Sequence, residues 1–181
     1  LQTFQPGAYS VLVSYDACFA SDTFNLVIFT NLPINLGDDI FICPGDTFPV
    51  IDAGYPGLTL YTWSVDANPV GFNTEQLQTT VPGLYALTGI SNTGCTGTDS
   101  VRVTLSTPET NLGLNTTICS NEGSPVLNAG NPGSDYYWYK DGFSVGTNSQ
   151  THQTAGGGIY SVLLINQFGC IASDSMTLTV L

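Results

Sequence analysis

One block of sequence occurs three times in this chain of 181 residues and constrains its fold more than any other feature. Each copy starts with Gly-x-Tyr in an alternating apolar stretch, continues to a Cys near a turn, and reaches an Asp-Ser or Asp-Thr pair that opens a second alternating stretch. The copies start at Gly7, Gly83 and Gly158. A unit that recurs at a nearly fixed spacing indicates an array of similar modules.

The repeated block predicts two antiparallel β-strands joined by a turn. Apolar or small residues occupy every second position from Tyr85 to Gly89 and again from Val101 to Leu105. This period of two is typical of half-buried strands. The other two copies alternate in the same way, at Tyr9, Val11, Val13, Phe24, Leu26 and Ile28 and at Tyr160, Val162, Leu164, Met176, Leu178 and Val180. An isolated hairpin is marginal in water, so we expect the first copy to need cover from outside its two strands.

The repeat frame predicts three segments. Residues 1–32 hold the C-terminal strands of a truncated repeat, and residues 33–107 and 108–181 are complete repeats. About seven short strands per repeat, frequent turn signals and no helical periodicity predict an all-β protein of tandem immunoglobulin-like β-sandwiches preceded by a C-terminal half-module. The junctions at 31–37 and 106–113 contain Pro33 and Pro108, which favour extended backbone, and we expect them to be short, semi-rigid linkers.

Aromatic residues recur at fixed places in this frame. Trp63 and Trp138 each lie in the middle of an expected strand, where a lone Trp is typical of the core of a sandwich. Tyr9, Tyr85 and Tyr160 follow the repeated Gly and lie where the tyrosine corner of such sandwiches is expected.

The charge balance excludes several functions. The chain has 2 Lys plus Arg against 14 Asp plus Glu, a net charge of −12. Binding of nucleic acid requires Lys and Arg to neutralise phosphates, so neither nucleic acid nor an anionic membrane is an expected partner. The sequence has no run of 18 apolar residues, so membrane insertion is not predicted. The start of the chain has no basic region typical of a signal peptide. These features are those expected of a piece of a longer, secreted protein.

The five cysteines follow the repeat frame as well. Cys43 corresponds to Cys119, and Cys95 corresponds to Cys170, so we expect the disulfides Cys43–Cys95 and Cys119–Cys170. Each would contribute about 4 kcal/mol by the chain-entropy model. Cys18 corresponds to Cys95, and its expected partner lies outside the chain. Zinc binding is disfavoured because CxxC and clustered His are absent, and disulfides indicate an extracellular compartment.

No catalytic constellation is found in the sequence, and neither an enzyme nor a cofactor is predicted. His152 is the single histidine and lies in a polar stretch. No nucleophile is identified for which it could act as a general base.

Asp38 and Asp39, together with Asp66, are candidate calcium ligands between repeats, because carboxylates are hard oxygen donors. The third repeat has Leu114 and Asn115 at the corresponding positions, which favours a solvated acidic turn instead.

The repeated string of motifs is Asn-Leu-Gly, Ile-Cys, Asp/Asn-Ala-Gly-x-Pro-Gly, Tyr-x-Trp, Gly-x-Tyr, Gly-Cys and Asp-Ser. It resembles the immunoglobulin-like or PKD-like repeats of giant cell-surface adhesins of Bacteroidota, including SprB-like gliding-motility adhesins exported by the type IX secretion system. This resemblance covers essentially the whole chain.

The Asp-Ser or Asp-Thr pair followed by an apolar residue resembles the O-glycosylation acceptor sequence of Bacteroidota. The resemblance implies glycan attachment at Thr23, Ser100 and Ser175. The alternative is a hydrogen bond from the backbone to the Asp side chain at the start of the strand.

The resemblance implies a non-enzymatic segment of a secreted bacterial adhesin or fibre at the cell surface, acting as a stalk or spacer and an adhesive surface. Its partners would be neighbouring repeats and surface polysaccharide or other cell-surface ligands. The alternatives are a carbohydrate-binding or spacer module of a secreted hydrolase, and a subunit of an extracellular filament. A homo-oligomeric fibre is consistent with the unpaired edge of the first segment.

Overall fold

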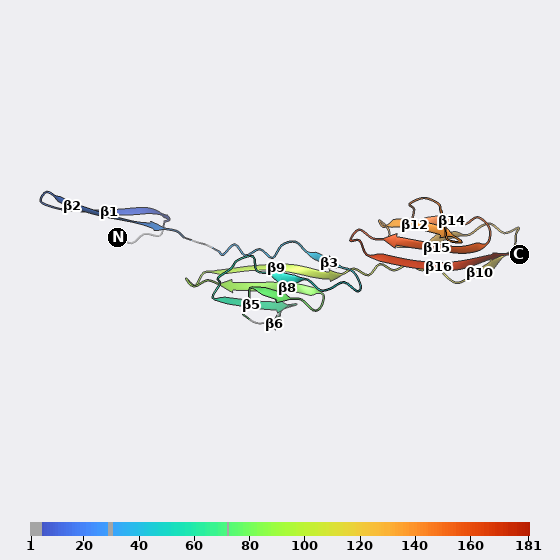
Figure 1. Ribbon diagram of the computed structural model, residues 1–181, viewed down its shortest axis with the longest axis horizontal. Helices are drawn as coiled ribbons and strands as arrows, with labels where there is room; N and C mark the ends of the chain where they lie inside the picture. Colours follow the sequence, from blue (N-terminus) through green and yellow to red (C-terminus); the bar gives the residue numbers. More distant parts are fainter. Residues whose placement is uncertain (1–4, 29–30, 72) are drawn as a thin grey trace. The chain divides into compact units, whose positions relative to one another are not determined.

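A computed structural model describes residues 5–28, 31–71 and 73–181, and every regular element in that part of the chain is a β-strand (Figure 1). No helix of the length and apolar character needed to cross a bilayer occurs among these residues. The prediction of an all-β fold is confirmed.

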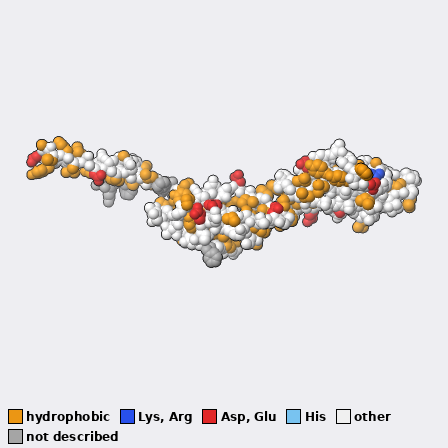
Figure 2. Space-filling model, in the orientation of Figure 1, with side chains coloured by type: hydrophobic (Ala, Val, Ile, Leu, Met, Phe, Trp, Pro, Cys, Tyr) orange, Lys and Arg blue, Asp and Glu red, His pale blue; other side chains and the backbone are white. Residues whose placement is uncertain are grey.

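The first copy of the repeated block forms a hairpin of β1 (Gly7–Tyr15) and β2 (Cys18–Leu26). The two strands pair antiparallel in an unbroken register from Gly7 opposite Leu26 to Tyr15 opposite Cys18. Most of its residues are exposed, including Val11 and Val13 at 56% and 58%. Apolar side chains are visible over this hairpin in Figure 2.

The next seven strands belong to the second repeat. They are β3 (Ile40–Ile42), β4 (Val50–Asp52), β5 (Leu60–Val65), β6 (Asn68–Val70), β7 (Gln76–Gln78), β8 (Gly83–Ile90) and β9 (Thr96–Leu105). Five of them form a sheet in the order β3-β9-β8-β5-β6, and β4 pairs with β7 in a second sheet.

The third repeat has the same seven strands in the same arrangement. They are β10 (Thr116–Ile118), β11 (Val126–Asn128), β12 (Asp135–Lys140), β13 (Phe143–Val145), β14 (Thr151–Gln153), β15 (Gly158–Ile165) and β16 (Ile171–Val180). The sheets are β10-β16-β15-β12-β13 and β11-β14. Seven strands in two sheets per repeat confirm the predicted immunoglobulin-like β-sandwich.

The first strand of each repeat pairs parallel to the last one. Ile40 to Ile42 lie opposite Val103 to Leu105, and Thr116 to Ile118 lie opposite Leu178 to Val180. A period-two pattern shows that a segment is a strand, but it carries no information about the direction of its partner. This parallel pairing determines where the cysteines lie.

The chain divides into two compact units by its internal contacts. The first consists of Leu1–Gly37, Ile51–Leu77 and Tyr85–Ser100, and the second consists of Asp38–Val50, Gln78–Leu84 and Val101–Leu181. These units are not bounded as the sequence repeats are, and the boundaries after residues 32 and 107 stay a prediction.

The core of the third repeat is one cluster of buried side chains around Trp138 and Tyr160, which are 1% and 0% exposed. Its other members are Leu112, Leu127, Ala129, Tyr136, Val162, Leu164, Met176 and Leu178. These residues come from alternate positions of the strands and from the segment before β10.

The segments expected to be linkers are in fact packed against the repeats that follow them. Leu32, Ile34 and Leu36 are each 7% to 8% exposed, and the backbone N–H of Leu32 donates to the carbonyl of Thr96 at 3.1 Å. A Cβ at Gly97 would lie 2.6 Å from the carbonyl oxygen of Leu32, so only glycine permits this close approach. The apolar alternation at 32, 34 and 36 was the sequence signal for this packing.

Candidate functional site

Both disulfides expected within single repeats are absent. Cys43 is instead bonded to Cys170, 127 residues away, with 5.2 Å between their Cα atoms. Cys18, Cys95 and Cys119 are free thiols; Cys18 and Cys119 are exposed and Cys95 is half-buried. The predicted pairs Cys43–Cys95 and Cys119–Cys170 are therefore wrong in this structure.

The parallel pairing of β3 with β9 explains the error. Ile42 lies opposite Leu105, so Cys43 lies beside the C-terminal end of β9, whereas Cys95 precedes its first residue. A strand of ten residues is roughly 30 Å long, and a disulfide requires Cα atoms within about 7 Å. Cys43 and Cys95 therefore lie beside opposite ends of β9, too far apart to be bonded.

The same geometry separates the other expected pair. Ile118 lies opposite Val180 at the end of β16, and Cys170 precedes the first residue of this ten-residue strand. Cys119 and Cys170 therefore lie beside opposite ends of β16.

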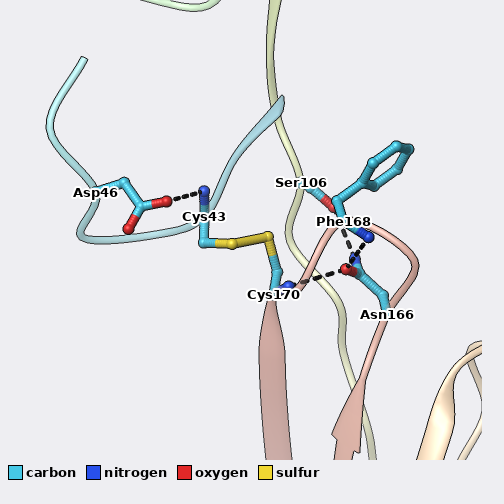
Figure 3. Close-up of a disulfide and its surroundings, with 6 residues drawn as sticks. All are labelled: Cys43, Asp46, Ser106, Asn166, Phe168 and Cys170. Carbon is cyan, nitrogen blue, oxygen red and sulfur yellow. Dashed lines mark hydrogen bonds between the residues drawn. A yellow bond between two sulfur atoms is a disulfide. The ribbon is translucent and has the colours of Figure 1, made fainter. Parts of the chain in front are cut away.

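The Cys43–Cys170 bond lies in the second compact unit, within a set of ordered turns (Figure 3). The carboxylate of Asp46 accepts a hydrogen bond from the backbone N–H of Cys43 at 2.7 Å. The Asn166 side chain accepts from the N–H of Phe168 and of Cys170, both at 3.0 Å. Cys170 is 1% exposed, so its half of the bridge is shielded from solvent.

Two further contacts in the same unit involve these turns. The Asn166 amide donates to the Ser106 hydroxyl at 2.8 Å, and the ring of Phe168 stacks on that of Phe41 with 3.7 Å between centroids. These contacts could not be predicted from the sequence, because they join residues of the second repeat to residues of the third, and the repeat pattern describes each repeat only by itself.

The Asp residues of the Asp-Ser pairs hold the segment that leads into each repeat. Asp99 accepts a hydrogen bond from the backbone N–H of Leu36 at 2.8 Å, and Asp174 accepts one from Leu112 at 2.7 Å. Asp22 in the hairpin accepts from the N–H of the adjacent Thr23 instead. The hydrogen bond from backbone to the Asp side chain, which was the alternative to glycosylation as an explanation of the motif, is thus observed. In both complete repeats this bond joins residues that are more than 60 positions apart in the sequence.

The hydroxyl residues that follow these Asp residues point to solvent. Thr23, Ser100 and Ser175 are all exposed. Ser100 and Ser175 each precede a buried residue, Val101 or Met176, and so face the opposite side of the strand, whereas Thr23 belongs to a strand that is exposed on both faces. Their exposure leaves room for a glycan, and glycosylation itself stays a prediction.

The acidic pair Asp38 and Asp39 has a structural role at least in part. Asp39 accepts a hydrogen bond from the N–H of Arg102 at 2.9 Å, and Asn115 makes the same bond to Thr177 at 2.8 Å. A neutral amide therefore serves in place of the carboxylate. Asp66 lies in the turn between β5 and β6 with a positive φ of 47°. Within the described ranges, no group of three or more His, Cys, Asp or Glu could hold a metal ion.

Of the repeated aromatic residues, Trp63, Trp138, Tyr85 and Tyr160 are buried, whereas Tyr9 lies half-buried in the hairpin and is not part of a sandwich core. Trp63 is 1% exposed and donates to the carbonyl of Thr74 at 2.9 Å, and Trp138 donates to Ser149 at 2.8 Å. The hydroxyls of the corner tyrosines bond upstream: Tyr160 donates to Gly156 and Tyr9 donates to Gln5. Tyr85 is 2% exposed.

His152 packs against the core of the third repeat. Its ring lies 5.2 Å from that of Trp138 and 5.9 Å from that of Tyr160, measured between centroids. Partial burial disfavours the charged imidazolium, and this desolvation lowers the pKa of His152 below its usual 6.5. The corresponding residue of the second repeat is Leu77. His152 therefore occupies a position that is apolar in the second repeat.

An open cleft of about 1020 Å³ lies in the third repeat, between the segment before β10 and the start of β16. Glu109, Asn128 and Asp174 are among its lining residues. Thr110 also lines the cleft, and its hydroxyl is buried without a hydrogen-bond partner in the structure. The corresponding residue of the second repeat is Ile34, an apolar residue that is 8% exposed.

The strand order and the repeated core define this chain as a tandem array of immunoglobulin-like β-sandwiches. No protein family matches its sequence, and no curated protein matches it. Among solved structures it is similar to Sidekick-1 immunoglobulin domains 1–4, at 13% identity and a TM-score of 0.35, over 99% of this chain and 59% of that chain.

It is also similar to the insect immune protein hemolin, at 12% identity and a TM-score of 0.44, over 96% of this chain and 56% of that one. The two immunoglobulin domains of DIP-gamma match 81% of the chain at 12% identity and a TM-score of 0.47, over 95% of their own length. The chain thus spans a little over half the length of Sidekick-1 domains 1–4 and of hemolin.

Proposed function

We propose that this chain is a non-enzymatic repeat segment of an extracellular bacterial cell-surface adhesin or fibre, in which the sandwiches act as a stalk and carry an adhesive surface. The observation that carries the proposal is the repeated hydrogen bond between Asp99 and Leu36 and between Asp174 and Leu112. Each repeat fixes the segment that leads into it, so a series of such repeats has little free linker. A spacer needs this property in order to hold a binding region at a distance.

The covalent and surface chemistry supports the same function. The Cys43–Cys170 bond is stable in an oxidising, extracellular compartment. The net charge of −12 keeps an exposed array soluble and disfavours contact with anionic polymers, so the adhesive partners we propose are neutral surface polysaccharide or other surface proteins.

Small-angle scattering tests the spacer function directly. Chains of one, two and three copies of residues 33–181 are measured, and the maximum dimension should grow by an equal increment with each copy. The matched control carries Asp99→Ala and Asp174→Ala in every copy, and its dimension should grow more slowly, as for beads on flexible linkers. If the maximum dimension of the unmodified chains grew by as little per copy as that of the control, the stalk function would be excluded.

We also propose that Thr23, Ser100 and Ser175 carry O-glycans in the native host. The support is their shared sequence context and their exposure beside Asp residues whose own carboxylates are engaged with backbone. Intact-mass measurement of native material should exceed the polypeptide mass, and the excess should disappear when all three are replaced by Ala. A native mass equal to that of the polypeptide would rule the glycans out.

A further inference from the structure

We propose that Cys95 and Cys119 are cross-linking positions, each of which forms a disulfide with a neighbouring immunoglobulin-like repeat of the same kind. The bonds would have the register of Cys43–Cys170: the cysteine after the first strand of one repeat joins the turn cysteine of the next repeat along the chain. This inference concerns covalent connectivity and does not depend on the adhesive function.

The connectivity of the observed bond is the first line of support. Cys43 follows the first strand of the second repeat, and Cys170 lies in the turn before the last strand of the third repeat. The bond is therefore offset by one repeat. In this register Cys119 requires the turn cysteine of a following repeat, and Cys95 requires the first-strand cysteine of a preceding one.

The turns around the free cysteines provide a second, independent line of support. At Cys170, the N–H donates to the Asn166 side chain and the carbonyl accepts from the Asn166 N–H, at 3.0 and 2.9 Å. At Cys95, the N–H donates to the Ser91 hydroxyl and the carbonyl accepts from the Ser91 N–H, at 3.1 and 2.9 Å. The free cysteine is held in the same kind of turn as the bonded one.

Cys119 likewise reproduces the surroundings of Cys43. The N–H of Cys43 donates to the Asp46 carboxylate, and its carbonyl accepts from the Asp46 N–H. The N–H of Cys119 donates to the Glu122 carboxylate at 2.9 Å, and its carbonyl accepts from the Glu122 N–H at 2.9 Å. Each thiol is thus presented by an ordered turn at the place that forms a bridge in the other repeat.

A bond within one repeat is not an alternative, because the two cysteines of a repeat lie beside opposite ends of a ten-residue strand. Formation of each bridge removes one hydrogen from each of two thiols. A low-molecular-weight disulfide such as oxidised glutathione takes up these two hydrogens, which are two protons and two electrons in total, and is thereby reduced to two thiols.

The first experiment uses the chain as it is. The protein is equilibrated in a buffer of reduced and oxidised glutathione, alkylated without reduction and digested for mass mapping. We expect Cys43 and Cys170 to be recovered as one linked peptide and Cys18, Cys95 and Cys119 to be alkylated. A linked peptide of Cys43 with Cys95, or of Cys119 with Cys170, would overturn the register.

The second experiment adds a repeat that can provide a partner for Cys119. Residues 107–181 are added once more directly after Leu181, which continues the natural spacing of the repeats. Cys119 should then be recovered bonded to Cys170 of the added copy, and its alkylation should be lost. The control replaces Cys170 of the added copy by Ser, and Cys119 should again be alkylated.

Three outcomes of the second experiment would overturn the proposal. Cys119 could remain alkylated in the extended chain, could bond to Cys170 of its own repeat, or could form a disulfide-linked dimer on a non-reducing gel. The stalk function is tested separately by scattering, so the absence of the predicted disulfides would not by itself argue against it.

Discussion

The carboxylate of Asp174 accepts a hydrogen bond from the backbone N–H of Leu112 at 2.7 Å, across 62 residues of sequence. Leu112 is 8% exposed and belongs to the core cluster of the third repeat. The bond therefore holds in place a segment that also contributes apolar packing. Asp99 and Leu36 are related in the same way in the second repeat, at 2.8 Å.

Replacement of this carboxylate should destabilise the third repeat. Asp174→Ala leaves the N–H of Leu112 without its partner, and we expect a loss of about 2 kcal/mol in the free energy of unfolding. Urea unfolding followed by Trp fluorescence measures it. Ser175→Ala is the matched control and should change stability by less than about 0.5 kcal/mol, because Ser175 is exposed. Equal effects of the two substitutions would contradict the assigned role of Asp174.

Thr110 offers a stabilising substitution. Its hydroxyl is buried without a partner, and the corresponding residue of the second repeat is Ile34, so Thr110→Val should raise the free energy of unfolding by about 1 kcal/mol. Thr116→Val is the control, because its hydroxyl donates to the Leu114 carbonyl at 2.9 Å and its loss should not stabilise. A neutral or negative effect of Thr110→Val would show that the hydroxyl has a partner in solution.

The strands could be predicted from the sequence, because the alternation of apolar residues at Tyr85 to Gly89 and Val101 to Leu105 is strong and recurs in all three copies of the block. The cysteine pairs could not, because they depend on the direction in which β3 pairs with β9. The long-range role of Asp99 was missed for a related reason: local bonding explains an Asp at a strand start equally well. The contact between Phe41 and Phe168 follows from tertiary packing alone.

His152 makes the stability of the third repeat depend on pH. Its pKa is lowered in the folded state by burial, so the unfolded chain binds the proton more tightly and stability falls as pH drops below about 6.5. The loss continues down to the folded pKa and then levels off. His152→Leu should remove this dependence and stabilise by roughly 1 kcal/mol, because Leu77 fills the corresponding position in the second repeat.

Unfolding curves between pH 7.5 and pH 5 measure the effect of His152. The reciprocal control is Leu77→His, which should introduce the same dependence into the second repeat. A His152→Leu variant that keeps the full pH dependence of the unmodified chain in this range would assign it to carboxylates instead.

Loss of the Cys43–Cys170 bond should have a large effect on stability. The bond closes a loop across 127 residues, for which the chain-entropy model gives about 4 to 5 kcal/mol. Cys43→Ser and Cys170→Ser should each destabilise by a similar amount, and the double variant should be no worse than either, because both remove one bond. Cys119→Ser is the control and should be nearly neutral, because that thiol is free and exposed.

The hairpin of β1 and β2 should exchange its amide hydrogens much faster than its counterpart in the third repeat, although the two share one sequence pattern. Val162, Leu164 and Met176 are 0% to 4% exposed, whereas Val11 and Phe24 in the hairpin are 56% and 58% exposed. A two-stranded hairpin without a covering layer is marginal in water, so its amides open through local unfolding.

Hydrogen exchange followed by mass spectrometry tests this difference in a sample shown to be monomeric. We expect exchange of β1 and β2 within seconds and protection of β15 and β16 on the scale of global unfolding. A matched variant, Phe24→Thr, removes the ring that stacks on Tyr9 at 5.5 Å between centroids and should speed exchange in the hairpin alone. Slow exchange of the hairpin in the monomer would mean that its exposed apolar residues are covered by another part of this chain, and that the expectation of an external cover is wrong.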